Sequence, residues 1–595
     1  MAPPVARPPF LDTFDAVKVN SEFALRRDGS SRSRSKTVGA VTTTIGLLAL
    51  SLSFLMSGHY PPWESFESEA TAALGGALVA VGALLVRGRR AFRISGLAAL
   101  VLGLACVPWV QWSVGQILFL QDAVLSSGYL AGFATMIVAG ETLSREDADF
   151  VGKLATAVGV AGVLSALIAI VQWLGASQNV LIDQVPSHSR PFANLGQPNH
   201  LATLLAAAFC ATYSAHEHRR LSGGPTTLLC VLLGVGMAAT QSRTGWLFVS
   251  AFVAWALAMH HKVEMQTQRW KIVLGAMLFG ALVLAWGTVS DTLMLSANTL
   301  AQRATSTARW PIYVLLLDAV RQAPWVGYGW NQVSLAQQGV ALGHPATHWW
   351  ILNSHNIILD IALWAGIPMA AISTYILARW IWLRGVACVT VRQWSLLAGI
   401  GAVWLHAMLE FPLNYLYFLL PLGLAMGAVQ ASSPDTQDSG HAPAEIVTIA
   451  VIALTSLAIW ITIDYIGVQA RTTALRFELA RFGKRHPPAD LLSNTVLLNA
   501  ESAHQRFWLA DVHRLESEED LDWQRNVVRR YAAAPGMMRW ALIAALNGRQ
   551  DESEHTLKLM CSMAKREACQ GARSDWRALQ KRYPELARIR FDEPP

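Results

Sequence analysis

The sequence predicts an all-α membrane protein with about thirteen transmembrane helices and a small helical soluble domain at its C-terminus. Hydrophobic residues make up 53% of the chain and charged residues only 15%, against roughly 25% in soluble domains. Apolar runs recur between residues 37 and 465, and charges become dense beyond them. Each run is expected to be a helix, because backbone polar groups in hydrocarbon must be paired within their own segment. The runs centre near residues 47, 78, 102, 132, 164, 207, 233, 252, 280, 367, 402, 422 and 455.

The distribution of Lys and Arg sets the expected orientation of these segments. Seven of these residues lie in the tail 1–36, none lies in the loop 58–69, and four lie in the loop 87–93. Cytoplasmic loops carry the positive excess, so the tail is expected in the cytoplasm and the odd segment count places residues 466–595 outside. The net charge of +7 then reflects orientation in a membrane, and no nucleic-acid partner is expected.

The longest polar stretch inside the transmembrane region 37–465 is residues 291–352, which we interpret as a large loop on the outer face. Within it, Arg309 begins an amphipathic run that continues to Asp318, with Thr305-Ser306-Thr307 before it. This pattern is typical of a helix N-terminus, where phosphate groups bind readily. The alternative for Arg309 is a helix that lies on the membrane surface.

Two shorter polar stretches, 189–200 and 241–246, are expected on the same face as this loop and as His355. Arg243 is the informative residue of the second one, since a guanidinium near a bilayer is costly without an anionic partner or access to the interface. A snorkelling side chain at a helix end is the alternative. The outer location and the neighbouring Ser242, Thr244 and Gln241 favour an anion site, so we predict that the three stretches form one site.

His355 lies just before the segment expected to run as a helix from Ile357 to Leu377. A lone His in this position is more often a capping group, but its near-neutral pKa also makes it the available general base on this face. Glu410 lies in a short outer turn and is expected to pair with an Arg or to orient this His. Several tryptophans of the large loop suit either an interfacial belt, which is favoured, or stacking against sugar rings. They are Trp325, Trp330, Trp349 and Trp350.

The tail 466–595 is expected to be a separate helical domain, resembling tetratricopeptide repeats without a clean period. A helix that ends at Asn547-Gly548 and a second one opened by Asp551 form a helix–turn–helix pattern. Cys561 and Cys569 lie in this second part, and either a disulfide or two free thiols suits them.

The three polar stretches resemble a known family. Residues 190–200, Arg-Pro-Phe-Ala-Asn-Leu-Gly-Gln-Pro-Asn-His, are similar to a motif of bacterial protein O-oligosaccharyltransferases of the pilin-glycosylating type. Gln241–Gly245, Arg309-Trp310 and Ser354-His355-Asn356 resemble the shared core of the wider superfamily, which includes O-antigen ligases and O-antigen polymerases. The resemblance extends over roughly residues 30–465, and the tail is similar to the C-terminal domain of the oligosaccharyltransferase branch.

The resemblance implies an inverting, metal-independent glycosyltransferase of the GT-C type in the bacterial inner membrane, with its active site facing the periplasm. The donor would be an oligosaccharide on undecaprenyl diphosphate, the acceptor a Ser or Thr of a periplasmic protein such as a pilin, and no cofactor would be needed. Carried over to this sequence, Arg243 and Arg309 would hold the diphosphate and His355 would take the acceptor proton. The resemblance does not fix a role for Arg190, Gln197 and Asn199 in the same way, and we assign these residues, with Glu410, to substrate binding.

Three other functions remain open at this point. Within the superfamily, the chain would transfer glycan to lipid A core or polymerise repeat units, although the Gln-Pro-Asn motif and the long tail favour a protein acceptor. A transporter is disfavoured because the sequence shows no inverted repeat and no matched pair of broken helices. A membrane assembly protein with an inactive site is the remaining alternative.

Overall fold

The computed structural model describes residues 34–591, apart from 177–179, 187–188, 294, 296–308, 433–439, 483–491, 494 and 514. Within this part, eight helices are long and apolar enough to cross a membrane. They are Arg34–Ser53, α2 (Phe66–Arg87), α3 (Gly96–Ser113), α4 (Leu120–Glu146), α5 (Phe150–Trp173), α9 (Arg269–Thr292), α13 (Ile357–Val386) and α16 (Ala444–Leu479).

Further helices complete the membrane region. They are α6 (Pro198–Glu217), α7 (Gly223–Ala239), α8 (Arg243–Met259), α14 (Val391–Ala407) and α15 (Leu416–Ala431). Every segment expected from the sequence coincides with a helix, so the chain is an all-α, multi-pass membrane protein. The number of thirteen crossings stays a prediction. Helix α16 continues to Leu479 and passes through the expected domain boundary at residue 465 without a break.

The bundle is centred on α4, which packs closely against α15. A Cβ atom added at Gly427 would lie 2.1 Å from the Ile137 carbonyl oxygen, and one at Gly140 would lie 2.3 Å from that of Leu424. Small residues let helix backbones approach in membranes, where van der Waals packing replaces the hydrophobic effect. Near one end of α4, the short strands β1 (Phe92–Ile94) and β2 (Gly440–Ala442) form an antiparallel pair.

The helix α13 is broken at Gly366, which has φ 86° and ψ 167°. The carbonyls left without helical partners are taken up from outside the helix: Tyr328 N–H donates to Leu363 O at 2.7 Å, and Gln111 Nε2 donates to Trp364 O at 2.8 Å. The sequence predicts an uninterrupted helix here, and this is wrong. The Gly-Ile-Pro sequence tolerates the break because glycine adopts positive φ without strain and the loop 324–329 supplies the missing hydrogen bonds.

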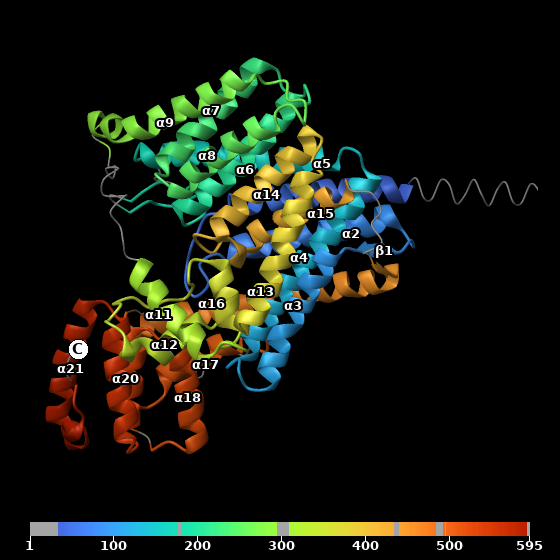
Figure 1. Ribbon diagram of the computed structural model, residues 1–595. Coiled ribbons are helices and arrows are strands. Elements are labelled where there is room, and N and C mark those ends of the chain that lie inside the picture. The colour runs from blue at the N-terminus through green and yellow to red at the C-terminus, as the bar shows by residue number, and fades with distance from the viewer. Residues whose placement is uncertain are drawn as a thin grey trace, which may run out of the picture.

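The segment expected as a loop contains the helices α11 (Arg309–Gln322) and α12 (Val333–Val340) and the 3₁₀ turn η1 (Ala341–Gly343). Figure 1 shows α11 and α12 beside the C-terminal helices, away from α7, α8 and α9. The C-terminal helices are α17 (Asn499–Leu509), α18 (Glu518–Arg530), α19 (Ala534–Leu546), α20 (Gln550–Met563) and α21 (Arg566–Arg582), followed by η4 (Pro584–Arg588).

These C-terminal helices have a core of their own, in which Phe507, Trp540, Met560 and Trp576 are almost fully buried. Helix α19 ends just before Asn547-Gly548 and α20 begins at Gln550, as the sequence predicts. Cys561 and Cys569 form a disulfide, which decides between the two alternatives left by the sequence. It closes the turn between α20 and α21.

Polar contacts attach this unit to the membrane helices. Arg530 of α18 makes a bidentate ion pair with Asp122 of α4, at 2.7 and 2.8 Å. Asp464 of α16 accepts hydrogen bonds from the backbone N–H groups of residues 496–498. The C-terminal helices are thereby held over the end of α4, next to the cavity described below.

Candidate functional site

The N-termini of three helices meet at one place. They belong to α6, α8 and α13, which contain or directly follow the three polar stretches singled out in the sequence. Asn199, near the start of α6, connects them: its amide nitrogen donates to Glu410 Oε1 at 3.1 Å, and its amide oxygen accepts from Ser242 Oγ at 2.7 Å. Ser242 immediately precedes α8, and Glu410 is in turn bonded to His355, just before α13. The structure therefore brings the stretches 189–200 and 241–246 together with His355, which follows the loop 291–352.

His355 and Glu410 form the closest polar contact of this site, with His355 Nδ1 at 2.5 Å from Glu410 Oε2. The Glu410 side chain is only 4% exposed, whereas that of His355 is 27% exposed. A carboxylate accepts hydrogen bonds only, so Nδ1 carries the proton in this pair. In the neutral imidazole the lone pair is then on Nε2, and the buried carboxylate fixes both the tautomer and the orientation of the ring.

His355 is not the capping residue of α13. The cap is Asn356, whose side-chain oxygen accepts hydrogen bonds from the N–H groups of Ile358 and Leu359. Asp360 supports the same turn by accepting a hydrogen bond from Ser354 N–H at 2.8 Å. His355 itself has a positive φ of 61°, a conformation that costs energy for a residue other than glycine. The surrounding turn thus holds the imidazole against Glu410, and capping does not explain its position.

Arg243 is the first residue of α8, and its side chain is exposed. Arg190 lies beside the same turn, since its Nη1 donates to the Thr240 carbonyl at 3.2 Å. Two arginines therefore belong to the region where three positive helix ends converge. This arrangement suits a multiply charged anion such as a diphosphate.

Two further residues were predicted for the site from the sequence, Arg309 and Gln197. Arg309 begins α11, as expected, but its side chain lies outside the described part of the structure. Gln197 immediately precedes α6 and lines a large cavity; its Oε1 is buried without a hydrogen-bond partner among the described residues.

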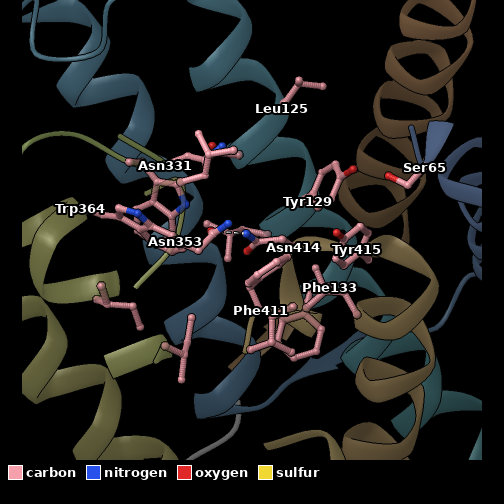
Figure 2. A pocket seen from close by; sticks show the side chains of 18 of the residues that line it. Ser65, Leu125, Tyr129, Phe133, Asn331, Asn353, Trp364, Phe411, Asn414 and Tyr415 are labelled. Carbon is pink, nitrogen blue, oxygen red and sulfur yellow. Dashed lines mark hydrogen bonds between the residues drawn. The ribbon is translucent and has the colours of Figure 1, made fainter. Parts of the chain in front are cut away.

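This cavity has a volume of about 1340 Å³ and lies between the membrane helices, the α11–α13 region and the C-terminal helices. Figure 2 shows part of its wall, to which Asn331, Asn353, Asn414 and Trp364 contribute side chains. Sequence reasoning missed these amides, because single asparagines in loops carry no recognisable pattern. It also favoured an interfacial belt for the loop tryptophans, whereas Trp330 and Trp350 line the cavity.

The sequence also matches models of known protein families. Residues 228–374 match the O-antigen ligase family model, residues 394–567 match the model described as virulence factor membrane-bound polymerase, C-terminal, and residues 191–213 match the protein glycosylation ligase model. The chain is thus similar to the O-antigen ligase superfamily and, within it, to the protein O-oligosaccharyltransferases. The short third match spans Asn199, the residue that connects the three helix ends.

Two relatives within the superfamily come from Acinetobacter baylyi. The chain is 28% identical over 539 residues to its general O-oligosaccharyltransferase, which covers 87% of this chain and 91% of the relative. It is 27% identical over 342 residues to the ComP-specific O-oligosaccharyltransferase, which covers 55% and 60% of the two chains.

Proposed function

We propose that this protein transfers a complete oligosaccharide from undecaprenyl diphosphate to Ser or Thr hydroxyls of periplasmic proteins such as pilins. The observation that carries the proposal is the hydrogen-bonded line from Ser242 through Asn199 and Glu410 to His355. It connects a general base to the anion-binding helix ends, and glycosyl transfer from a diphosphate donor needs both. The names of the two relatives and the protein glycosylation ligase match support a protein acceptor.

In the proposed reaction, His355 Nε2 removes the proton from the acceptor hydroxyl as its oxygen attacks the anomeric carbon. The new bond joins that carbon to the acceptor oxygen, and the bond from the carbon to the diphosphate oxygen breaks. A single displacement of this kind inverts the anomeric configuration. Glu410 stabilises the imidazolium that forms, because its buried carboxylate is 2.5 Å from Nδ1.

The leaving diphosphate would be held by Arg243, by Arg309 and by the N–H groups at the helix ends. Developing negative charge on a phosphate oxygen is stabilised by preorganised donors and cations, and this supplies a large part of the rate enhancement in many enzymes. The proposed mechanism assigns these roles to side chains and backbone N–H groups of the protein, and it uses no metal and no cofactor. Arg190 and Asn199 would position the donor, in part through the contacts described above.

The decisive experiment is transfer by the purified protein from an undecaprenyl-diphosphate-linked oligosaccharide to a purified pilin. A lipid A core acceptor is the matched control, and we expect a glycosylated pilin and an unchanged lipid. Transfer to the lipid alone would instead establish an O-antigen ligase, and elongation of the donor would establish a polymerase. Transfer should persist in a chelating buffer, and strict dependence on a divalent ion would contradict the mechanism.

The proposed location of the site on the periplasmic side is tested by fusion of alkaline phosphatase after Arg309 and after Arg90. We expect activity in the first fusion and none in the second, because Lys and Arg alternate between loops. The opposite pattern would exclude a periplasmic site in the bacterial inner membrane.

A further inference from the structure

We infer that the basic face of α21 is a docking surface for an acidic segment of the acceptor protein. The inference rests on the proposed function, and it adds the charge of the acceptor and the place where the acceptor is held. The observation that carries it is a stripe of three exposed cations, Arg566, Arg577 and Lys581, which begins beside the chain segment that leads to His355.

The stripe follows from helical spacing. Arg577 and Lys581 come 11 and 15 residues after Arg566, which is about three and four turns, so the three side chains share one side of α21 and span about 22 Å. Another side of the helix carries Cys569 and Trp576, which are buried in the core of the C-terminal unit. Packing against this core therefore turns the basic side outward.

The cations of α21 differ from those of the neighbouring helices in their partners. Around α18 and α20, Arg549 pairs with Glu518, and Lys558 pairs with Glu554. The three cations of the stripe make no ion pair with an Asp or Glu of the described residues. Residues 565–590 contain eight Lys and Arg against three Asp and Glu, whereas residues 518–563 contain six against seven. Positive charge that the protein leaves unneutralised is complementary to an acidic partner.

An acidic protein fits this surface better than a bilayer does. A helix that lies on a membrane inserts its apolar face, whereas the apolar face of α21 is used in the core and none of its large apolar side chains is exposed. Helix α21 packs against α19, α20 and η4. Figure 1 shows it at the outer edge of the C-terminal unit, beyond α20.

The first residue of the stripe is held close to the loop that carries the proposed base. In that loop, His348 N–H donates to Ser562 O at 3.0 Å, and His348 Nδ1 donates to Ala564 O at 3.2 Å, two residues before Arg566. The disulfide that closes the turn between α20 and α21 fixes the start of the helix at this contact. Docking on the stripe thus holds the acceptor beside the segment that continues to His355.

The test uses two variants of the full-length protein that lose the same charge. The stripe variant combines Arg566→Gln, Arg577→Gln and Lys581→Gln. The matched variant combines Arg506→Gln, Arg549→Gln and Lys558→Gln, which removes cations that are paired with carboxylates of the C-terminal unit. Thermal unfolding of both variants checks that they fold, since exposed charges contribute little to stability.

Kinetics of transfer to a purified pilin give the first result. We expect the KM for pilin to rise about tenfold in the stripe variant, or about twofold for each of three exposed charge pairs, with kcat and the KM for the donor unchanged. Added NaCl should raise the KM for pilin of the parent more than that of the stripe variant, because salt screens exposed charges. An unchanged KM for pilin, or an equal rise in the matched variant, would overturn the docking surface.

The lipid composition of nanodiscs separates a protein partner from a lipid partner. The stripe variant should show its raised KM for pilin both in phosphatidylcholine discs and in discs that contain phosphatidylglycerol. A defect confined to the discs with phosphatidylglycerol would assign the stripe to anionic lipid and overturn the inference.

Binding of a fluorescent peptide of ten Glu residues needs no transfer, with ten Gln residues as the control peptide. We expect the Glu peptide to bind the parent and the matched variant, and to bind the stripe variant at least about fivefold more weakly. Equal binding to the parent and the stripe variant would overturn the surface. Stripe-dependent binding of the Glu peptide without glycosylation of any pilin would instead refute the proposed function and leave the stripe as a surface for acidic segments.

Discussion

Glu410 Oε2 lies 2.5 Å from His355 Nδ1, although the two residues are 55 positions apart in the chain. The carboxylate is buried and also accepts a hydrogen bond from Asn199, so its orientation is fixed from a third segment. Such a pair leaves Nε2 as the proton acceptor. The neighbouring Asn356 caps the helix, so the structural role at this turn is separate from the catalytic role proposed for His355.

His355→Ala should bind the lipid-linked donor nearly as well as the parent and transfer it about 10²–10⁴-fold more slowly, the usual scale of general acid–base catalysis. Single-turnover transfer, donor binding and thermal unfolding measured together check this. Asn356→Ala is the control, since loss of the cap should lower stability by about 1 kcal/mol and largely spare the chemistry. Lost donor binding in His355→Ala would make this residue a diphosphate ligand and leave the base unidentified.

Glu410→Gln should slow transfer by about 10–100-fold, the scale on which groups that orient a functional histidine act. Because Glu410 acts through His355, the double variant with His355→Ala should be no slower than His355→Ala alone. Rate constants of the two single variants and the double variant decide this. Multiplicative losses would show that Glu410 acts independently, for example on the substrate.

Arg243→Ala should weaken donor binding by about 10–100-fold, because a hydrogen bond to a charged group contributes about 1.5–3 kcal/mol. Arg243→Lys should rescue poorly, since an ammonium lacks the planar fork for two phosphate oxygens. Arg269→Ala is a matched control, because Arg269 is also the exposed first residue of a helix, α9, but begins it on the side predicted to face the cytoplasm. Equal effects of Arg243→Ala and Arg269→Ala on donor binding would show that Arg243 is not part of the site.

Arg309→Ala should also lose transfer. Full activity of this variant would show that Arg309 only begins a helix on the membrane surface.

Gly366→Ala should destabilise the protein by about 1–3 kcal/mol, the cost of a strained backbone conformation. Its φ is 86°, and an added Cβ atom would lie 2.3 Å from the Trp325 carbonyl oxygen. Gly385→Ala in the same helix is the control, since its Cβ would meet nothing within 4 Å. Thermal unfolding in detergent checks the difference, and equal stability of the two variants would contradict the close packing at the break.

Replacement of both Cys561 and Cys569 by alanine should lower stability and transfer together. The turn that this disulfide closes includes Ser562, whose carbonyl accepts a hydrogen bond from His348 N–H at 3.0 Å, on the segment that leads to His355. Removal of a native disulfide typically costs about 2–5 kcal/mol. Cys106→Ala, which removes an exposed free thiol, is the control. Unchanged transfer at a lowered melting temperature would show that the disulfide contributes to stability but not to transfer.

The sequence by itself determined the features that depend on local composition. Apolar runs predict the helices of the membrane region, since a backbone in hydrocarbon has no other way to pair its polar groups. The change in charge after residue 465 indicates a second unit, although helix α16 continues to Leu479 because helix continuity does not end where composition changes. The polar stretches also led to the candidate site residues His355 and Arg243 and their neighbours, because charged and hydrogen-bonding groups are conspicuous in an apolar chain.

Only the tertiary structure decided how these groups meet. The contacts of Asn199 with Glu410 and Ser242 join residues 211 and 43 positions apart, which no local pattern encodes. The break at Gly366 depends on the distant loop 324–329, whose N–H groups donate hydrogen bonds to the carbonyls that the break leaves free. Whether Trp330 lies in a membrane belt or in the cavity wall depends on which elements pack around it. Long-range contacts form where helices pack, so their partners are set by the assembled bundle rather than by any one segment.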